Sequence, residues 1–170
     1  MKVFLIGFMG SGKTTVAKKL AAKMNCAWDD LDRIIEQDTG MSIGRIFQEK
    51  GEPAFREMEH RYLKEMETAT KQVIATGGGT PCHHANMDYM NQVGITVYLK
   101  MTPEQLYSRL KDTRGQRPLL KDLNDQDLLH YIDQKLRERE SFYDKAHIRV
   151  SGFDLDVKAL EKSIFARLKQ

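Results

Sequence analysis

Short, mostly apolar runs alternate along the chain with longer stretches of helical periodicity. The runs predict five strands, at 3–6, 27–30, 72–76, 95–100 and 148–150. The longer stretches predict helices at 13–24, 42–50, 53–68, 84–92, 102–110, 125–143 and 154–168. Strands separated by helices in this way are typical of a parallel sheet that helices cover on both faces. The pattern therefore predicts an α/β fold with a five-stranded parallel sheet flanked by helices.

The predicted helix starts and one connection add detail to this pattern. Thr102-Pro103-Glu104 supplies a capping residue, a first-turn proline and an acid, and Asp154 precedes the last helix. The stretch 111–124 is polar, contains a glycine and a proline, and shows no clear period. It is predicted to be a mobile loop.

Length and composition indicate one globular domain over residues 1–170. Hydrophobic residues make up 41% and charged residues 30%, which is typical of a folded chain. The net charge of +3 is too small to indicate nucleic acid binding. Cys26 and Cys82 form no CxxC pair, which favours reduced thiols in a cytoplasmic protein. Since no apolar run approaches membrane-spanning length and the first strand begins at once, neither a membrane span nor a signal peptide is expected.

Residues 7–14 match the phosphate-binding pattern G-x-x-x-x-G-K-[ST] between a predicted strand and a predicted helix. Backbone N–H groups and the helix N-terminus of such a loop point at phosphate oxygens. Lys13 can reach the β- and γ-phosphates, and the Thr14 hydroxyl can ligate Mg²⁺. A glycine-rich turn without a ligand is the alternative. The residues of this loop expected to contact ATP are Gly10, Ser11, Gly12, Lys13, Thr14 and Thr15.

Acidic residues follow the second predicted strand, and ligands of open parallel sheets bind beyond the carboxyl ends of the strands. Asp30 and Asp32 share one side of an extended chain. There, one can hold Mg²⁺ through water and the other can accept a hydrogen bond from an attacking hydroxyl. The alternative is that these acids cap the following helix, and for Asp29 capping is the favoured interpretation.

Arg56 and Arg139 are candidates for holding an anionic substrate. Arg56 lies in the first turn of a predicted helix, where a cation opposes the helix dipole. Either a bound anion or an ion pair with Glu59 would explain it. Arg139 takes a core position in the apolar stripe of helix 125–143, while Arg137 turns away. A buried arginine needs a partner, which a carboxylate-bearing substrate or an internal acid can supply.

The third predicted strand runs into Gly77-Gly78-Gly79. Three glycines there permit a close backbone approach to a ligand, or simply a flexible turn. Thr76 stands where many phosphate-loop proteins place a magnesium-binding acid, so metal support would fall to Thr14 and Asp30.

The basic loop after residue 110 contains Arg117, which precedes Pro118 and is therefore biased to extended backbone. Such a loop can close over a nucleotide, exclude water and bring a guanidinium to the transferring phosphoryl group. A solvated surface loop is the alternative. Cys82-His83-His84 has no matching ligand cluster elsewhere in the sequence, so no metal site is predicted there.

These motifs together resemble those of the shikimate kinase family, occur in that family's order and span nearly the whole chain. They are the loop 7–15, Asp30-Leu31-Asp32 with Ile35-Glu36, Ser42-Ile43 with Ile46-Phe47, Gly51-Glu52 with Phe55-Arg56 and Glu59, Gly77-Gly78-Gly79, Arg117-Pro118-Leu119-Leu120, and Arg139 with Tyr143.

The resemblance implies a P-loop fold of the nucleoside-monophosphate-kinase-like type, with a substrate-binding subregion at 32–62 and a lid at 111–124. It implies that the γ-phosphoryl group of ATP passes, with Mg²⁺, to the 3-hydroxyl of shikimate, in aromatic amino acid biosynthesis. It also implies a monomer whose partners are small molecules.

The resemblance further assigns roles to single residues. Asp32 would bind the shikimate hydroxyls and can act as a base, while Arg56 and Arg139 would clamp the carboxylate. Lys13 and Arg117 would act on the transferring phosphoryl group. The other expected contacts are Phe47, Phe55, Gly77, Gly78 and Gly79 with shikimate, and Arg109 with adenine. The arginine that some members carry after the last strand has no clear counterpart in 151–154.

Other functions remain open at this stage. The nearest is a kinase for another polyol acid such as gluconate. A nucleoside monophosphate kinase is less favoured, because Arg56, Arg139 and the triple glycine suit a carboxylate and hydroxyls. A nucleotide sensor that transfers nothing would need neither the acceptor pocket nor Arg117.

Overall fold

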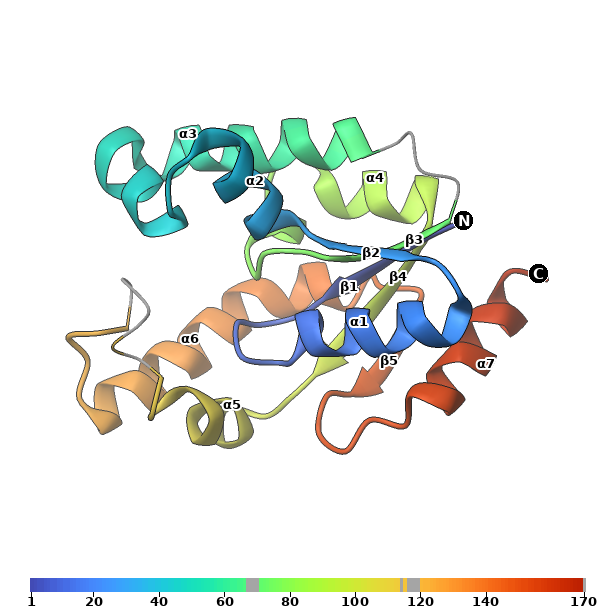
Figure 1. The fold of residues 1–170 in the computed structure, drawn as a ribbon. Coiled ribbons are helices and arrows are strands. Elements are labelled where there is room, and N and C mark those ends of the chain that lie inside the picture. The colour runs from blue at the N-terminus through green and yellow to red at the C-terminus, as the bar shows by residue number, and fades with distance from the viewer. Residues whose placement is uncertain (67–70, 114, 116–119, 170) are drawn as a thin grey trace.

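The computed structural model describes residues 1–66, 71–113, 115 and 120–169. At its centre is a five-stranded sheet in the order β2-β3-β1-β4-β5, and every neighbouring pair of strands is parallel (Figure 1). The predicted parallel sheet is therefore confirmed. The strands are β1 (Lys2–Ile6), β2 (Ala27–Asp30), β3 (Gln72–Ala75), β4 (Ile95–Lys100) and β5 (Ile148–Ser151).

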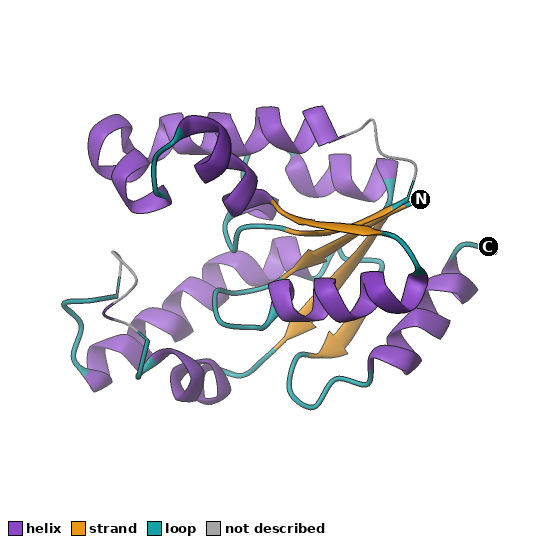
Figure 2. Cartoon of the chain, viewed as in Figure 1, coloured by secondary structure: helices purple, strands orange, loops and turns teal. Residues whose placement is uncertain are grey.

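Helices cover both faces of the sheet (Figure 2). On one face, α1 (Lys13–Met24) and α7 (Val157–Arg167) pack on one side of β1, on Val3 and Leu5. On the other face, Phe4 and Ile6 pack against a second set of helices. These are α2 (Leu31–Thr39), α3 (Ile43–Glu65), α4 (Asn86–Val93) and α6 (Asp125–Tyr143). Because both faces are covered, β1 is buried along its whole length.

A third apolar cluster lies beside the phosphate loop. It joins Phe8 to Leu106 and Leu110 of α5 (Pro103–Leu110) and to Leu128 and Ile132 of α6. The apolar stripe of α6 runs through Leu128 and Ile132 and continues to Tyr143, which is fully buried.

Helix α2 was not predicted. It is short, and its residues suggested only a strand end followed by acids. Its N-cap is Asp30, whose side chain accepts from the backbone N–H of Arg33, and Leu31 and Ile35 face the core one turn apart. The expectation of an extended chain through Asp32 is therefore wrong, because β2 ends at Asp30.

Helix α3 joins the two helices predicted at 42–50 and 53–68, and it begins at Ile43 and ends at Glu65. Gly51 interrupts it with φ 81° and ψ 167°, and Pro53 follows, so the predicted break is confirmed. The last helix begins later than predicted: Asp156, not Asp154, is the N-cap of α7, since its side chain accepts from the N–H of Lys158.

The short 3₁₀ helix η2 (Thr80–Cys82) follows the triple glycine. Cys26 and Cys82 are both free thiols. Across the described part of the chain, no helix combines the length and apolar character needed to span a membrane.

Candidate active site

The phosphate loop joins β1 to α1. Gly12 is the N-cap of α1 with φ 90°, a left-handed backbone that glycine adopts without strain. The N–H groups that begin α1 have no partner within the helix and favour an anion. Ser11 is buried, and its Oγ has no hydrogen-bond partner among the described residues. A phosphate oxygen in the loop would supply one.

Lys13 and Thr14 follow the loop glycines into α1. Lys13 Nζ folds back and donates to the carbonyl oxygens of Gly7 and Phe8, each at 2.8 Å. Thr14 Oγ1 donates to Oδ2 of Asp30 at 2.6 Å and so links α1 to the end of β2. Hydroxyl and carboxylate oxygens of this kind are suitable ligands for Mg²⁺.

Asp30 caps α2, as the alternative interpretation expected, and its carboxylate also contacts Thr14. One carboxylate oxygen accepts from Thr14, and the other accepts from the N–H of Arg33 at 3.4 Å and caps α2. The expectation that Asp29 caps the helix is wrong, because its carboxylate accepts a hydrogen bond from the side-chain amide of Gln72.

Asp32 lies in the first turn of α2, half-buried beside the triple glycine. Its Oδ1 is buried, and none of the described residues donates a hydrogen bond to it. Burial, reinforced by the nearby carboxylates of Glu59 and Asp30, raises the pKa of Asp32 to about 7, although Lys13 acts against this. A carboxylate with a raised pKa and an unused acceptor is suited to take a hydrogen bond from a hydroxyl.

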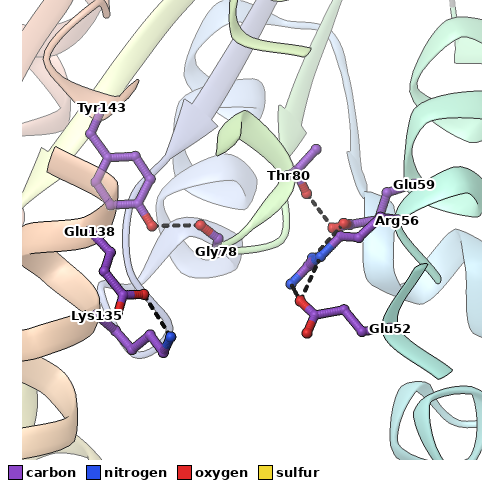
Figure 3. Close-up of polar contacts among 8 residues, drawn as sticks. All are labelled: Glu52, Arg56, Glu59, Gly78, Thr80, Lys135, Glu138 and Tyr143. Carbon is purple, nitrogen blue, oxygen red and sulfur yellow. Dashed lines mark hydrogen bonds and ion pairs between the residues drawn. The ribbon is translucent and has the colours of Figure 1, made fainter. Parts of the chain in front are cut away.

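Arg56 is buried on α3 and is held by two carboxylates (Figure 3). Its Nη1 donates to Oε2 of Glu59 at 2.6 Å, and its Nε and Nη2 donate to Oε1 of Glu52 at 3.1 and 2.9 Å. Glu59 is fully buried and also accepts from the hydroxyl of Thr80. The pairing with Glu59 that the sequence offered as an alternative is therefore present, and Glu52 is a second partner that the sequence did not reveal.

The triple glycine follows β3 and lies between α3 and α6. A Cβ on Gly79 would lie 2.6 Å from Nη2 and 2.7 Å from Cζ of Arg56, so only glycine fits against this guanidinium. On the other side, the Tyr143 hydroxyl donates to the Gly78 carbonyl at 2.5 Å (Figure 3). The close backbone approach is thus between the glycines and side chains that surround the site.

Arg139 comes from α6 and is half-buried. Its Cζ lies 5.4 Å from the ring centroid of Phe8, and its Nη1 would lie 3.3 Å from a Cβ on Gly78. No acid of the described chain forms an ion pair with it. Arg137, two residues earlier, is exposed and pairs with Asp133 at 2.9 Å, which confirms that it turns away from the core.

One cavity of about 430 Å³ is lined by all eight residues that were expected to bind the acceptor. It lies between α2, α3, the triple glycine and α6, and Met9 of the phosphate loop closes one side. The rings of Phe47 and Phe55 are 4.7 Å apart at the break in α3. The expected residues among its lining are Asp32, Phe47, Phe55, Arg56, Gly77, Gly78, Gly79 and Arg139.

Several residues of this cavity had no individual assignment from the sequence. Glu36 accepts from the N–H of Ile43 at 2.9 Å and ties α2 to the start of α3. The only signal for Glu36 and Ile43 in the sequence was their place in the family motifs, since neither side chain has a distinctive chemistry. The lining residues without an assigned role were Met9, Glu36, Ser42, Ile43 and Gly44.

Arg109, at the end of α5, lies against the phosphate loop. Its Nη1 donates to the Gly10 carbonyl and its Nη2 to the Gly152 carbonyl, each at 3.3 Å. Arg117 lies outside the described residues, as do residues 114, 116, 118 and 119 of the predicted lid. The lid at 111–124 therefore stays a prediction.

A larger cavity, of about 650 Å³, opens between the ends of β4 and β5 and helix α6, away from the phosphate loop. Its charged rim is internally paired: Lys100 with Glu140 at 2.7 Å, and Arg137 with Asp133 at 2.9 Å. Paired charges of this kind require no ligand, so the smaller cavity beside the phosphate loop is the candidate active site.

Three features together define the class of protein. They are a parallel sheet in this strand order, a phosphate loop at the start of α1, and an acceptor cavity beside that loop. The chain is a P-loop phosphotransferase with a nucleoside-monophosphate-kinase-like fold. The family model described as shikimate kinase matches residues 9–169, and the chain belongs to the shikimate kinase family.

Individual relatives agree with this assignment. The chain is 39% identical to a shikimate kinase of Bacteroides thetaiotaomicron over 170 residues, which is 100% of this chain and 97% of that protein. It is 44% identical to a shikimate kinase of Bacteroides fragilis over 147 residues, which is 86% of this chain and 82% of that protein.

Solved structures are similar over the same length. A crystal structure of the B. thetaiotaomicron shikimate kinase has a TM-score of 0.90 at 36% identity and covers 100% of this chain and 99% of that one. Shikimate kinase from Acinetobacter baumannii in complex with shikimate has a TM-score of 0.84 at 32% identity, covering 99% and 92%. A deoxyadenosine kinase from M. mycoides, at 18% identity and a TM-score of 0.57, shares the fold only.

Proposed function

We propose that the chain transfers the γ-phosphoryl group of ATP to the 3-hydroxyl of shikimate and yields shikimate 3-phosphate and ADP. The observation that carries this is the single cavity in which Asp32, Arg56 and Arg139 meet beside the phosphate loop, in a chain of the shikimate kinase family. The product belongs to the route to chorismate and the aromatic amino acids.

Shikimate is a hydroxylated ring acid, and each of its parts has a counterpart in the cavity. Its carboxylate pairs with Arg56 and Arg139, which approach from α3 and α6. Phe47 and Phe55 pack against the ring. The hydroxyls bind to Asp32 and to the backbone of residues 77–79, of which Gly78 comes closest to Arg139.

The phosphate loop holds the ATP phosphates, and Mg²⁺ binds beside it. Residues 10–15 supply N–H groups and hydroxyls, and Lys13 leaves the carbonyls of Gly7 and Phe8 to reach the β- and γ-phosphates. Thr14 ligates the metal directly and Asp30 through water. The described residues hold no cluster of three or more Asp, Glu, His or Cys for a metal, so phosphates and water complete the coordination. When bound, the ion neutralises charge on the transferring group.

Asp32 orients the attacking hydroxyl. Because phosphoryl transfer has a loose transition state, positioning and charge stabilisation contribute more than proton removal. A carboxylate with a pKa of about 7 can nevertheless accept the hydroxyl proton late in the reaction. Asp32 therefore serves as both hydrogen-bond acceptor and proton acceptor.

The remaining assignments follow from family membership. We propose that residues 1–170 form one domain, with 32–62 as the substrate-binding subregion and 111–124 as the lid. Arg117 closes onto ATP, and Arg109, which already bridges Gly10 and Gly152, stacks on adenine. The protein works as a monomer in the cytoplasm.

ADP release from MgATP tests the function. Three reactions are compared, with shikimate, with gluconate and with no acceptor. Release that depends on shikimate supports the proposal. Release that depends on gluconate assigns another polyol-acid kinase, and release equal in all three, or none, contradicts acceptor phosphorylation altogether.

A further inference from the structure

Arg56 is closely enclosed, and only 10% of its side chain is exposed. Gly79 lies against one face, because a Cβ there would be 2.6 to 2.7 Å from Cζ and both Nη atoms. The ring centroids of Phe47 and Phe55 lie 5.8 and 5.3 Å from Cζ. A carboxylate must therefore bind along an edge, where the N–H groups point.

Two carboxylates already hold the edges of Arg56, and they differ in burial. The side chain of Glu59 is 1% exposed and also accepts from Thr80, so it is a fixed part of the cavity wall. The side chain of Glu52 is 56% exposed, although one of its oxygens receives both Nε and Nη2. Glu52 is therefore the partner that can be displaced into water.

Glu52 also lies at the break in α3. Gly51, with φ 81°, interrupts the helix immediately before it, and Pro53 follows. Its side chain is not fixed by the core that holds Phe55 and Ile46. Rotation of Glu52 away from Arg56 therefore leaves the helix and the cavity wall in place.

The charges around Glu52 are those that the substrate carboxylate would meet. Hydrogen bonding from Arg56 holds the pKa of Glu52 below its usual value, and the charges of Arg56, His83 and Arg139 act in the same direction. Figure 3 shows the Glu52 carboxylate at the end of the Arg56 side chain, opposite Glu59. Glu52 thus presents to Arg56 the group that a carboxylic acid substrate would present.

We propose that Glu52 is an internal competitor for the substrate carboxylate. Without substrate it occupies the Nε and Nη2 edge of Arg56, and an acid substrate displaces it, while Glu59 keeps the guanidinium in position. This role rests on the proposed function. Glu52 would weaken the binding of acid substrates, and it would restrict the site to ligands that can replace a carboxylate on Arg56. The apparent affinity is reduced by the fraction of molecules in which Glu52 is bound.

Replacing Glu52 by Gln tests the proposal. The KM for shikimate, measured at saturating MgATP, should fall about two- to fivefold, the scale of one exposed ion pair, with kcat unchanged. Glu49→Gln is the matched control, because it removes the same charge from the same helix but breaks only the exposed pair of Glu49 with Arg45. The control should leave the shikimate KM unchanged.

Glu52→Asp keeps the charge at this helix start but shortens its reach, and it should also lower the KM. It separates competition from any loss of folding, which a melting curve would reveal. If Glu52 instead held Arg56 in place, both variants would raise the KM, and a raised or unchanged KM overturns the proposal while the proposed function stands. Absence of shikimate-dependent ADP release in the wild type would overturn both.

Discussion

At the scale of single residues, the site is built from charged side chains that are wholly or partly buried. Arg139 is the clearest, since it is half-buried on α6 and the acids of the described chain leave it without an ion pair. Under the proposed function, the carboxylate of the substrate is its partner.

Replacing Arg139 by Ala should raise the shikimate KM roughly 10- to 100-fold, the range for a hydrogen bond to a charged group, because the carboxylate loses one of its two cations. The ATP KM should not change, since the carboxylate lies away from phosphorus. Steady-state kinetics in both substrates measures this. Arg137→Ala, which removes an exposed arginine from the same helix, is the control. An unchanged shikimate KM in Arg139→Ala would refute the clamp.

The raised pKa of Asp32 predicts that enzyme activity depends on pH. Because its pKa is about 7, activity that needs the carboxylate should rise with pH, reach half its maximum near pH 7 and level off roughly one pH unit higher. Asp32→Asn should lose most of its activity and this limb of the profile. A rate near that of the wild type would leave Asp32 only a positioning role at most.

The same residue should affect stability with the opposite sign. Its pKa is raised from 3.8 to about 7 on folding, so stability is fully present below about pH 4 and falls as the pH rises toward 7. Asp32→Asn should therefore melt higher than the wild type at pH 8, by about 3 to 8 °C, and at the same temperature near pH 4. If the variant and the wild type melted at the same temperature at both pH values, burial would not destabilise the Asp32 carboxylate.

At the scale of elements, the loop after β3 must pack directly on α3. Gly79→Ala would place a methyl group within 2.7 Å of the Arg56 guanidinium and should raise the shikimate KM by at least about tenfold. Gly40→Ala is the control: its methyl group meets open space, and φ 65° costs stability but leaves the site intact. A KM equally changed in both variants would show that the close approach at Gly79 has no part in binding.

The sequence predicted elements well where the signal was local. The phosphate loop, the break at Gly51 and the cap of α5 at Thr102 are specified by adjacent residues, and the structure confirms all three. Helix α2 was missed because only Leu31, Ile34 and Ile35 mark its apolar side, and its stability comes from packing on the rest of the core.

The pairing of Arg56 with Glu52 was beyond the sequence for a related reason. At a spacing of four, either helix pairing or substrate binding explains the arginine. Only the structure distinguishes the two carboxylates that pair with Arg56, because it shows that Glu59 is buried and Glu52 is exposed.

At the scale of the whole molecule, the strand order β2-β3-β1-β4-β5 brings distant segments to one edge of the sheet. It places the end of β2, the loop after β3 and the phosphate loop after β1 side by side, and α6 completes the cavity. Alternation of strands and helices predicts the class of fold but not this order. The convergence of Asp32, Arg56 and Arg139 was expected from their positions in the sequence and from the family motifs, and the structure brings them around one cavity.

The position of the transferred phosphoryl group on the acceptor is the decisive measurement. The protein is incubated with MgATP and shikimate, and the products are resolved by ³¹P NMR. We expect a single new phosphate ester on the 3-hydroxyl, with one ADP formed for each ester. An ester on another hydroxyl, or ADP formed without any ester, would contradict the placement of an acid substrate between the two arginines and the phosphate loop.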